Sequence, residues 1–164
     1  MSQLQIYFLR LLLFLFLQSF IFNQLEISAS IHIMIAPLYV FLLPFDRSIL
    51  SLLLIALVLG VAIDATSNTF GLHTSSLLLF AYLRPIIFRG FSPRDGYDTL
   101  KSPSIFDMGN RWFISTFSIL LFSHHLWFFI LEAFSFSETL LILKKTILRC
   151  NFICCLCYLT NNLY

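Results

Sequence analysis

An uncharged apolar run that ends in a carboxylate constrains the fold of this chain more than any other feature. The run, ILSLLLIALVLGVAI at Ile49–Ile63, is flanked by Arg47 and Asp64. As a helix, the uncharged stretch Ser48–Ile63 would be about 24 Å long, whereas the hydrocarbon core of a bilayer is about 30 Å thick. A spanning helix must therefore continue past Asp64 or thin the membrane around it. A charge at that depth is costly, so we expect Asp64 to have a role.

The composition of the whole chain is that of an integral membrane protein. Of its 164 residues, 59% are apolar and 11% are charged, whereas about 25% of the residues in soluble domains are charged. Its mean hydropathy is +0.91. The net charge of +2 is too small to indicate nucleic-acid binding. We therefore expect a single polytopic membrane domain over residues 1–164, in contact with the lipid bilayer and without a nucleic-acid partner.

The apolar segments and the turn-forming residues between them predict an all-α fold, a compact bundle of about six transmembrane helices. The expected spans cover residues 4–22, 31–45, 48–66, 72–88, 112–134 and 138–160. Pro37 and Pro44 would kink the second span, and Asn68 and Gly71 form a turn between the third and the fourth. The polar segment 89–111 is expected to be a loop in water. In the alternative, five helices span the membrane and the C-terminal segment is an interfacial amphipathic helix.

The first span has a second interpretation as a secretory signal. Leu11–Leu17 is apolar enough for the core of a signal peptide, and Ser28-Ala29-Ser30 resembles a cleavage site. Arg10 alone makes a weak basic region, however. An uncleaved first helix fits a multi-pass protein at least as well.

The positions of lysine and arginine predict which side of the membrane each loop occupies. If the N-terminus is inside, the inner connections hold Arg10, Arg47, Arg89, Arg94, Lys101 and Arg111. The outer connections hold none, so the pattern follows the positive-inside rule and predicts a cytoplasmic N-terminus and a cytoplasmic loop 89–111. Lys144, Lys145 and Arg149 are the exception, because they lie near the outer half of the last span. They leave the side of the C-terminus open.

A series of short motifs resembles a known family. The series is Leu43-Pro44-Phe45, Gly60-x-x-x-Asp64, Ser67-Asn68-Thr69-x-Gly71-x-His73, Leu83-Arg84-Pro85 and Ser92-Pro93-Arg94-Asp95-Gly96-Tyr97. In their order and spacing these motifs resemble the rod shape-determining protein MreD family, most of all the form found in the Bacteroidetes group. The likeness covers about residues 4–136. The tail departs from it, because Lys144 and Lys145 and the cysteine-rich end are more polar than the apolar last helix of such proteins.

The resemblance implies a small multi-pass protein of the bacterial inner membrane that acts in cell elongation. Its expected partners are an MreC-like membrane-anchored protein, the actin-like MreB filament and the peptidoglycan synthase of elongation. The expected function is that of a non-enzymatic scaffold for cell-wall synthesis that maintains rod shape through helix and loop contacts. The alternative is a small-molecule carrier, since a six-helix protein of this size also resembles the substrate-binding subunits of energy-coupling-factor transporters. A carrier needs converging polar residues, whereas those of this chain are scattered in depth.

Two candidate sites lie around the turn between the third and fourth spans. Asp64 and His73 have matching depths on either side of it, which predicts a shared intramembrane polar site near the outer face. In the plainer interpretation, Asp64 caps the turn and His73 is an interface residue. Ala56, Gly60 and Asp64 follow one another at four-residue steps, and small residues at this spacing let another helix pack closely. That helix could belong to a partner or to this chain.

Two further candidates lie on the predicted inner side. Arg84 and Pro85 are expected to form an interface anchor and a kink. Arg94 and Asp95 are expected to point outward from the membrane and to contact a cytoplasmic partner, because a proline and a glycine turn would present them.

No catalytic motif or cofactor site is recognisable, so we expect neither enzymatic activity nor a cofactor or metal. His124 and His125 are adjacent and point about 100° apart on a helix, an arrangement that does not suit a shared metal. We therefore expect each to form a hydrogen bond to a neighbouring helix. The cysteines do not have the spacing of a zinc site. We expect inert packing for Cys150, Cys154, Cys155 and Cys157.

Overall fold

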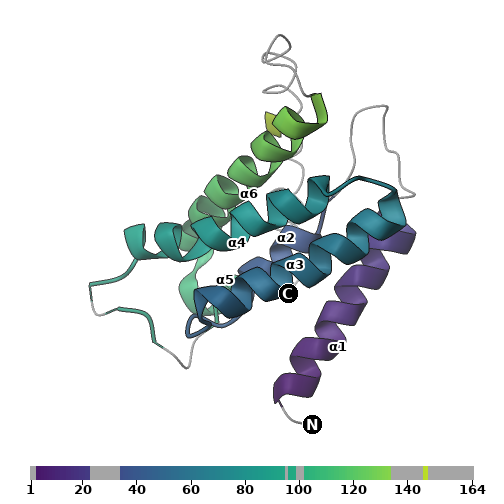
Figure 1. Cartoon of the computed structure of the whole chain (residues 1–164). Helices are drawn as coiled ribbons and strands as arrows, with labels where there is room; N and C mark the ends of the chain where they lie inside the picture. The colour runs from purple at the N-terminus through teal and green to yellow at the C-terminus, as the bar shows by residue number, and fades with distance from the viewer. Residues whose placement is uncertain (1–2, 23–33, 95, 99–101, 134–145, 148–164) are drawn as a thin grey trace.

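Every regular element in the described part of the chain is a helix. The computed structural model describes residues 3–22, 34–94, 96–98, 102–133 and 146–147. Its elements are α1 (Gln3–Phe16), the π-helix η1 (Leu17–Phe22), α2 (Ala36–Phe41), α3 (Ile49–Ser67), α4 (Leu72–Gly90), α5 (Ile105–Met108) and α6 (Asn110–Ala133). The predicted all-α fold class is therefore confirmed (Figure 1). The predicted last span lies outside the described residues, except for Thr146 and Ile147.

The helices α3 and α4 begin and end within two residues of their predicted ranges. Ser48 starts α3, because its hydroxyl accepts a hydrogen bond from the Ser51 amide at 3.3 Å. Asn68 ends α3 in the left-handed conformation, with φ of 54°, and Gly71 precedes α4 with φ of 86°. Asparagine and glycine tolerate this conformation better than other residues. The turn between α3 and α4 therefore lies at its predicted position.

Within the described residues, two helices are long and apolar enough to cross a membrane, Ile49–Ser67 and Asn110–Glu132, with mean hydropathies of 2.5 and 1.6. In the first of them only 28% of the apolar stretch is buried in the structure. Much of its apolar surface therefore faces outward, as a lipid-exposed helix requires. The helix α4 has the same length, but Thr74, Ser75, Ser76 and Arg84 lower its hydropathy.

The predicted second span, residues 31–45, is wrong in its described part. Between Met34 and Phe45 the only helix is α2, with six residues, which is about 9 Å long and too short to cross a bilayer. Pro37 lies in its first turn, where a missing N–H has no helical partner to lose. Pro44 follows its end. The two prolines therefore delimit a short helix instead of kinking a long one.

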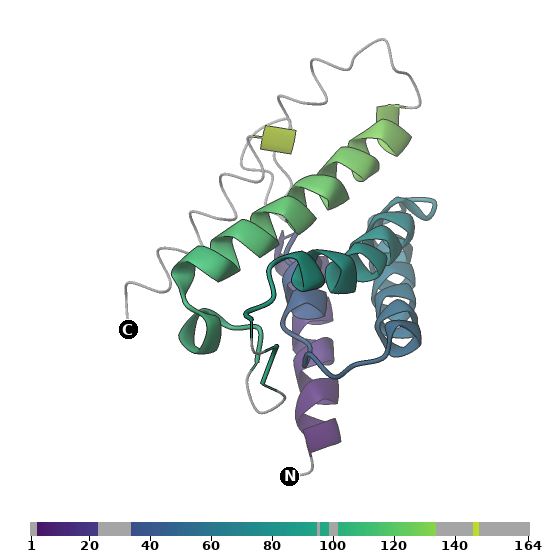
Figure 2. The same cartoon turned by 90° about the vertical axis from the view of Figure 1, so that its left-hand side faces the viewer.

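The short helix α2 contacts α1, α3, α4 and α6. The helix α4 lies between α3 and α6 (Figure 1), and the side view shows the α3–α4 hairpin beside α6, with α1 below them (Figure 2). The core contains fully buried Val40 and Phe41 of α2, Leu77 and Phe80 of α4, and Leu120 of α6.

Polar contacts attach the first helix to the rest of the bundle. The Tyr39 hydroxyl donates to the Tyr7 carbonyl at 3.0 Å. The side-chain oxygen of Gln18, in η1, accepts from the Ile35 amide at 2.7 Å. The described residues 3–22 are thus packed as a part of the fold.

Candidate functional site

The carboxylate of Asp64 joins the last turn of α3 to the first turn of α4. Its Oδ1 accepts hydrogen bonds from the Thr69 hydroxyl at 2.7 Å and from the His73 amide at 3.0 Å. Its Oδ2 accepts from the amide and the hydroxyl of Thr74, at 2.9 and 2.5 Å. Gly71, which precedes α4, has no side chain to satisfy the free N–H groups of the first turn. Asp64, in the preceding helix, accepts hydrogen bonds from two of these N–H groups and so acts as the N-terminal cap of α4. It also places a negative charge at the positive end of the α4 dipole.

Asp64 and His73 are thus brought together, and their contact runs through the His73 backbone amide. His73 is 8% exposed, and its ring packs against Phe128 of α6, with ring centroids 4.9 Å apart. The other donors to Asp64 are Thr69 and Thr74, which sequence reasoning did not single out. Since both carboxylate oxygens accept two hydrogen bonds each, the group is engaged in holding the turn together.

The small-residue stripe makes its closest approach to α4 of the same chain. Ala56 is fully buried, and a Cβ atom added to Gly60 would lie 2.5 Å from the Cα atom of Thr74. Real Cβ atoms do not come so close to backbone, so a residue larger than glycine would push the two helices apart. The sequence alone did not show whether the closely packed helix belongs to a partner or to this chain. In the structure, Gly60 packs on α4 of this chain.

Arg84 is buried, which corrects the prediction that it anchors the chain at an interface. Its side chain is 2% exposed. Its Nε and Nη2 donate to the Phe41 carbonyl, both at 3.2 Å, and Nη2 also donates to the carbonyls of Leu43 and Pro44. These oxygens lie at and just beyond the end of α2, where carbonyl groups lack helical partners. Arg84 therefore caps α2, and Pro85 follows it within α4.

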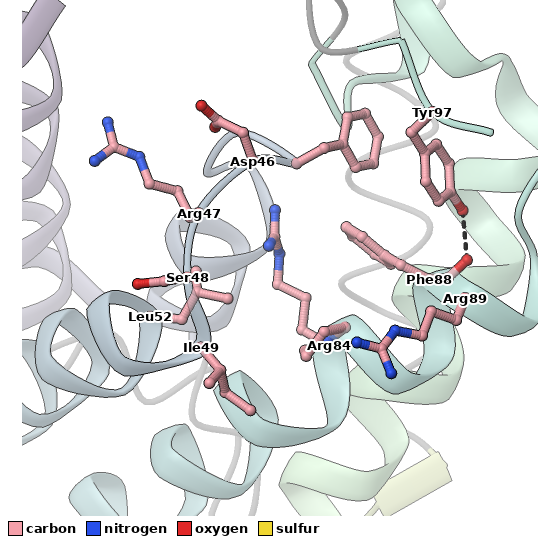
Figure 3. Close-up of a pocket in the computed structure, with 11 residues that line it drawn as sticks. Asp46, Arg47, Ser48, Ile49, Leu52, Arg84, Phe88, Arg89 and Tyr97 are labelled. Atoms are coloured by element: carbon pink, nitrogen blue, oxygen red, sulfur yellow. Dashed lines mark hydrogen bonds between the residues drawn. The ribbon is translucent and has the colours of Figure 1, made fainter.

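A cavity of about 480 Å³ opens beside Arg84, between the α2–α3 connection and the second half of α4 (Figure 3). Of the residues that the structure describes, three arginines line it, Arg47, Arg84 and Arg89, and one carboxylate, Asp46. In the part of the chain that the structure describes, none of these arginines forms an ion pair with a carboxylate. The cavity wall is therefore cationic and aromatic.

Tyr97 fixes the start of the 89–111 segment against this cavity. Its ring stacks on Phe45, with centroids 4.4 Å apart and an interplanar angle of 11°. Its hydroxyl donates to the Phe88 carbonyl at 2.6 Å and accepts from the Trp112 indole at 3.1 Å. Partial burial raises the pKa of Tyr97 above its ordinary value, so the phenol remains a neutral donor at pH 7.

Arg94, the predicted cytoplasmic contact, is exposed. It lies in a turn in which the Gly96 amide donates to the Pro93 carbonyl at 3.0 Å, with Gly96 at φ of 79°. Its predicted companion Asp95 lies outside the described residues. The turn leaves Arg94 available to a partner.

The remaining candidates are the histidines and the cysteines. His125 Nδ1 lies 2.9 Å from the Leu121 carbonyl of its own helix. His124 lies against the backbone of Ser76 in the neighbouring helix α4, but neither of its ring nitrogens forms a bond of full hydrogen-bond geometry within the described residues. No three metal-binding side chains gather in the described ranges. The four cysteines lie outside them.

Sequence reasoning missed the cavity, because Arg47 and Arg89 were interpreted only as markers of topology. It also missed the anchoring role of Tyr97 and Trp112. One signal was present: Arg84 is a charged residue inside an apolar segment with no acid at helical spacing, and such a residue faces the protein interior in most membrane proteins.

No protein-family model matches the sequence, and neither do the curated proteins or the solved structures with which it was compared. The likeness to the MreD family therefore rests on the motif series alone.

Proposed function

We propose that this chain is a multi-pass protein of the bacterial inner membrane and a non-enzymatic scaffold of the cell-elongation machinery. The membrane part of the proposal is supported by the composition and by the two long apolar helices. It is also supported by the outward apolar face of α3, where Leu50, Leu54, Val58 and Val61 are each more than half exposed. Exposed apolar surfaces of this kind are typical of sites that contact lipid or another protein.

One observation carries the scaffold proposal: four residues of the family-like motifs fix the helices relative to one another. Gly60 permits the close packing of α3 on α4, and Asp64 caps α4 from α3. Arg84 holds the end of α2, and Tyr97 holds the loop against α4. A protein whose distinctive residues maintain its shape is suited to presenting surfaces to partners. By resemblance, these partners are an MreC-like protein, the MreB filament and the elongation synthase.

The proposed topology can be checked by cysteine labelling. Phe70 is 99% exposed in the α3–α4 turn, and Ser92 is exposed at the other end of the hairpin. In a chain with its native cysteines replaced by alanine, Phe70→Cys should react with an impermeant maleimide in intact spheroplasts. Ser92→Cys should react only after lysis. The reverse pattern would place the N-terminus outside and contradict the proposal.

Depletion of the protein should round rod-shaped cells, and the tagged protein should capture an MreC-like partner.

Charge reversal at exposed Arg94 should reduce this capture about fivefold, since an interface charge of this kind is worth about 1 kcal/mol. Arg111→Glu is the matched control, because Arg111 is also exposed and lies in the same predicted loop; it should capture the partner as the unmodified chain does. Normal rods after clean deletion, together with a vitamin-sized molecule in the purified protein, would favour the carrier instead.

A further inference from the structure

The cationic cavity beside Arg84 requires an explanation that helix capping does not supply. Arg84 is 2% exposed, yet among the described residues its charge is met only by carbonyl oxygens and by the ring of Phe88, whose centroid lies 4.6 Å from the guanidinium carbon. A buried charge without a counter-ion is costly. Its Nη1 donates to no group within the described residues. The cavity thus offers an unused donor from a deeply buried cation.

Two further arginines line the same space, and the guanidinium of Arg47 points away from Arg84 toward α1 (Figure 3). Arg89 lines the cavity from the last turn of α4, and Arg47 and Ser48 line it at the start of α3 (Figure 3). The N-terminus of α3 adds the positive end of a 19-residue helix. Asp46, the one acid among the described lining residues, is exposed. This combination of guanidinium groups and a helix N-terminus is suited to a phosphate group.

A second, apolar groove has one lining residue in common with the cavity. It has a volume of about 430 Å³ and lies between α1, α2 and α3, with Tyr7, Leu11, Tyr39 and Ile55 among its lining residues. Arg47 lines both spaces. Its guanidinium lies over the Tyr7 ring, 5.3 Å from the centroid, and its buried Nε has no hydrogen-bond partner among the described residues. A cationic cavity that adjoins an apolar groove matches a molecule with an anionic head and a hydrocarbon chain.

We propose that the cavity binds the phosphate of an anionic phospholipid, with an acyl chain of that lipid in the α1–α2–α3 groove. Arg84 and Arg89 hold the phosphate, and Arg47 lies at the junction of head and chain. This inference rests on the membrane placement in the proposed function, which puts the cavity at the level of the inner headgroups. It is independent of any role in wall elongation.

The test measures lipid binding to the purified full-length chain in a non-ionic detergent, by thermal shift and native mass spectrometry. Phosphatidylglycerol should bind at least tenfold more tightly than phosphatidylcholine, because the choline ammonium opposes the arginines. Arg89→Gln and Arg47→Gln should each weaken phosphatidylglycerol binding about tenfold, the loss expected for a charge-assisted hydrogen bond or a close ionic contact. These two side chains form no hydrogen bond within the described residues, so both variants should fold. Arg111→Gln, at an exposed position of α6 that does not line the cavity, should bind as the unmodified chain does.

Two further comparisons separate the lipid from other anions. Short-chain phosphatidylglycerol should bind more weakly than the long-chain lipid, and Leu11→Trp, which fills the groove, should remove that difference. Inorganic phosphate that protects the protein as well as the lipid does would assign the cavity to a soluble anion and overturn the proposal. Equal binding of the two lipids, or unchanged binding in both arginine variants, would overturn it as well. None of these measurements depends on an elongation partner, so this proposal and the scaffold proposal can fail separately.

Discussion

Replacing Gly60 with leucine should lower the free energy of unfolding by about 3 kcal/mol, the upper part of the range for overpacked sites. Even the first atom of the new side chain would lie 2.5 Å from the Thr74 Cα atom and 3.0 Å from its hydroxyl oxygen. Backbone cannot move aside as the end of a flexible side chain can, so α3 and α4 must separate. Gly60→Ala should show a smaller loss in the same direction. Thermal unfolding of the purified protein and its abundance in membranes measure the effect.

Gly90 provides the matched control for this substitution. It is the last residue of α4, and a Cβ atom added there meets no other atom within 4 Å. Gly90→Leu should therefore change stability by less than about 0.5 kcal/mol, as surface substitutions usually do. If Gly60→Leu unfolds like the unmodified chain but loses its partners, the glycine faces a partner helix, and the α3–α4 packing described above is contradicted.

The α3–α4 hairpin could be predicted from the sequence because its signals are local. A continuous apolar run, a serine cap and a turn with Asn68 and Gly71 each act within a few residues. The short helix α2 could not be predicted in this way. Its apolar residues are buried by contacts with four other helices, and a span of 31–45 was inferred from hydropathy alone. Hydropathy does not distinguish burial in protein from burial in lipid.

The candidate site was predicted in part for the same reason. Asp64 and His73 were placed at matching depths by counting residues from the turn, and the backbone contact between them follows from that count. The long-range contacts of Arg84 could not be counted, since its carbonyl partners lie 40 to 43 residues earlier in the chain. The arginine cavity depends on the folding of α2 onto α4, so no local sequence pattern predicts the cavity.

Removal of the Asp64 carboxylate should destabilise the chain by about 2 to 4 kcal/mol, because a helix cap is typically worth about 1 kcal/mol and a hydrogen bond to a charged group about 1.5 to 3. Asp64→Ala would leave the amides of His73 and Thr74 without their acceptor at the start of α4. Asp64→Asn keeps one acceptor oxygen but turns an NH₂ group toward other donors, so about half of the loss should remain. Asp46→Asn is the control, since this exposed carboxylate accepts no hydrogen bond among the described residues. Stability in Asp64→Ala equal to that of the control would mean that the turn is held by other contacts.

Gly60 and Asp64 should act through one residue, which a double-mutant cycle can reveal. Thr74 is the residue that Gly60 allows to approach, and it gives both its amide and its hydroxyl to Asp64. Gly60→Ala should move Thr74 away from Asp64 and weaken their hydrogen bonds. In that background, Asp64→Ala should therefore lower the free energy of unfolding by less than it does in the unmodified chain. Residues that share a contact typically show coupling of about 0.5 to 3 kcal/mol, and we expect a value in this range with that sign. Simple additivity of the two substitutions in thermal unfolding would show that close packing and capping hold the α3–α4 turn independently.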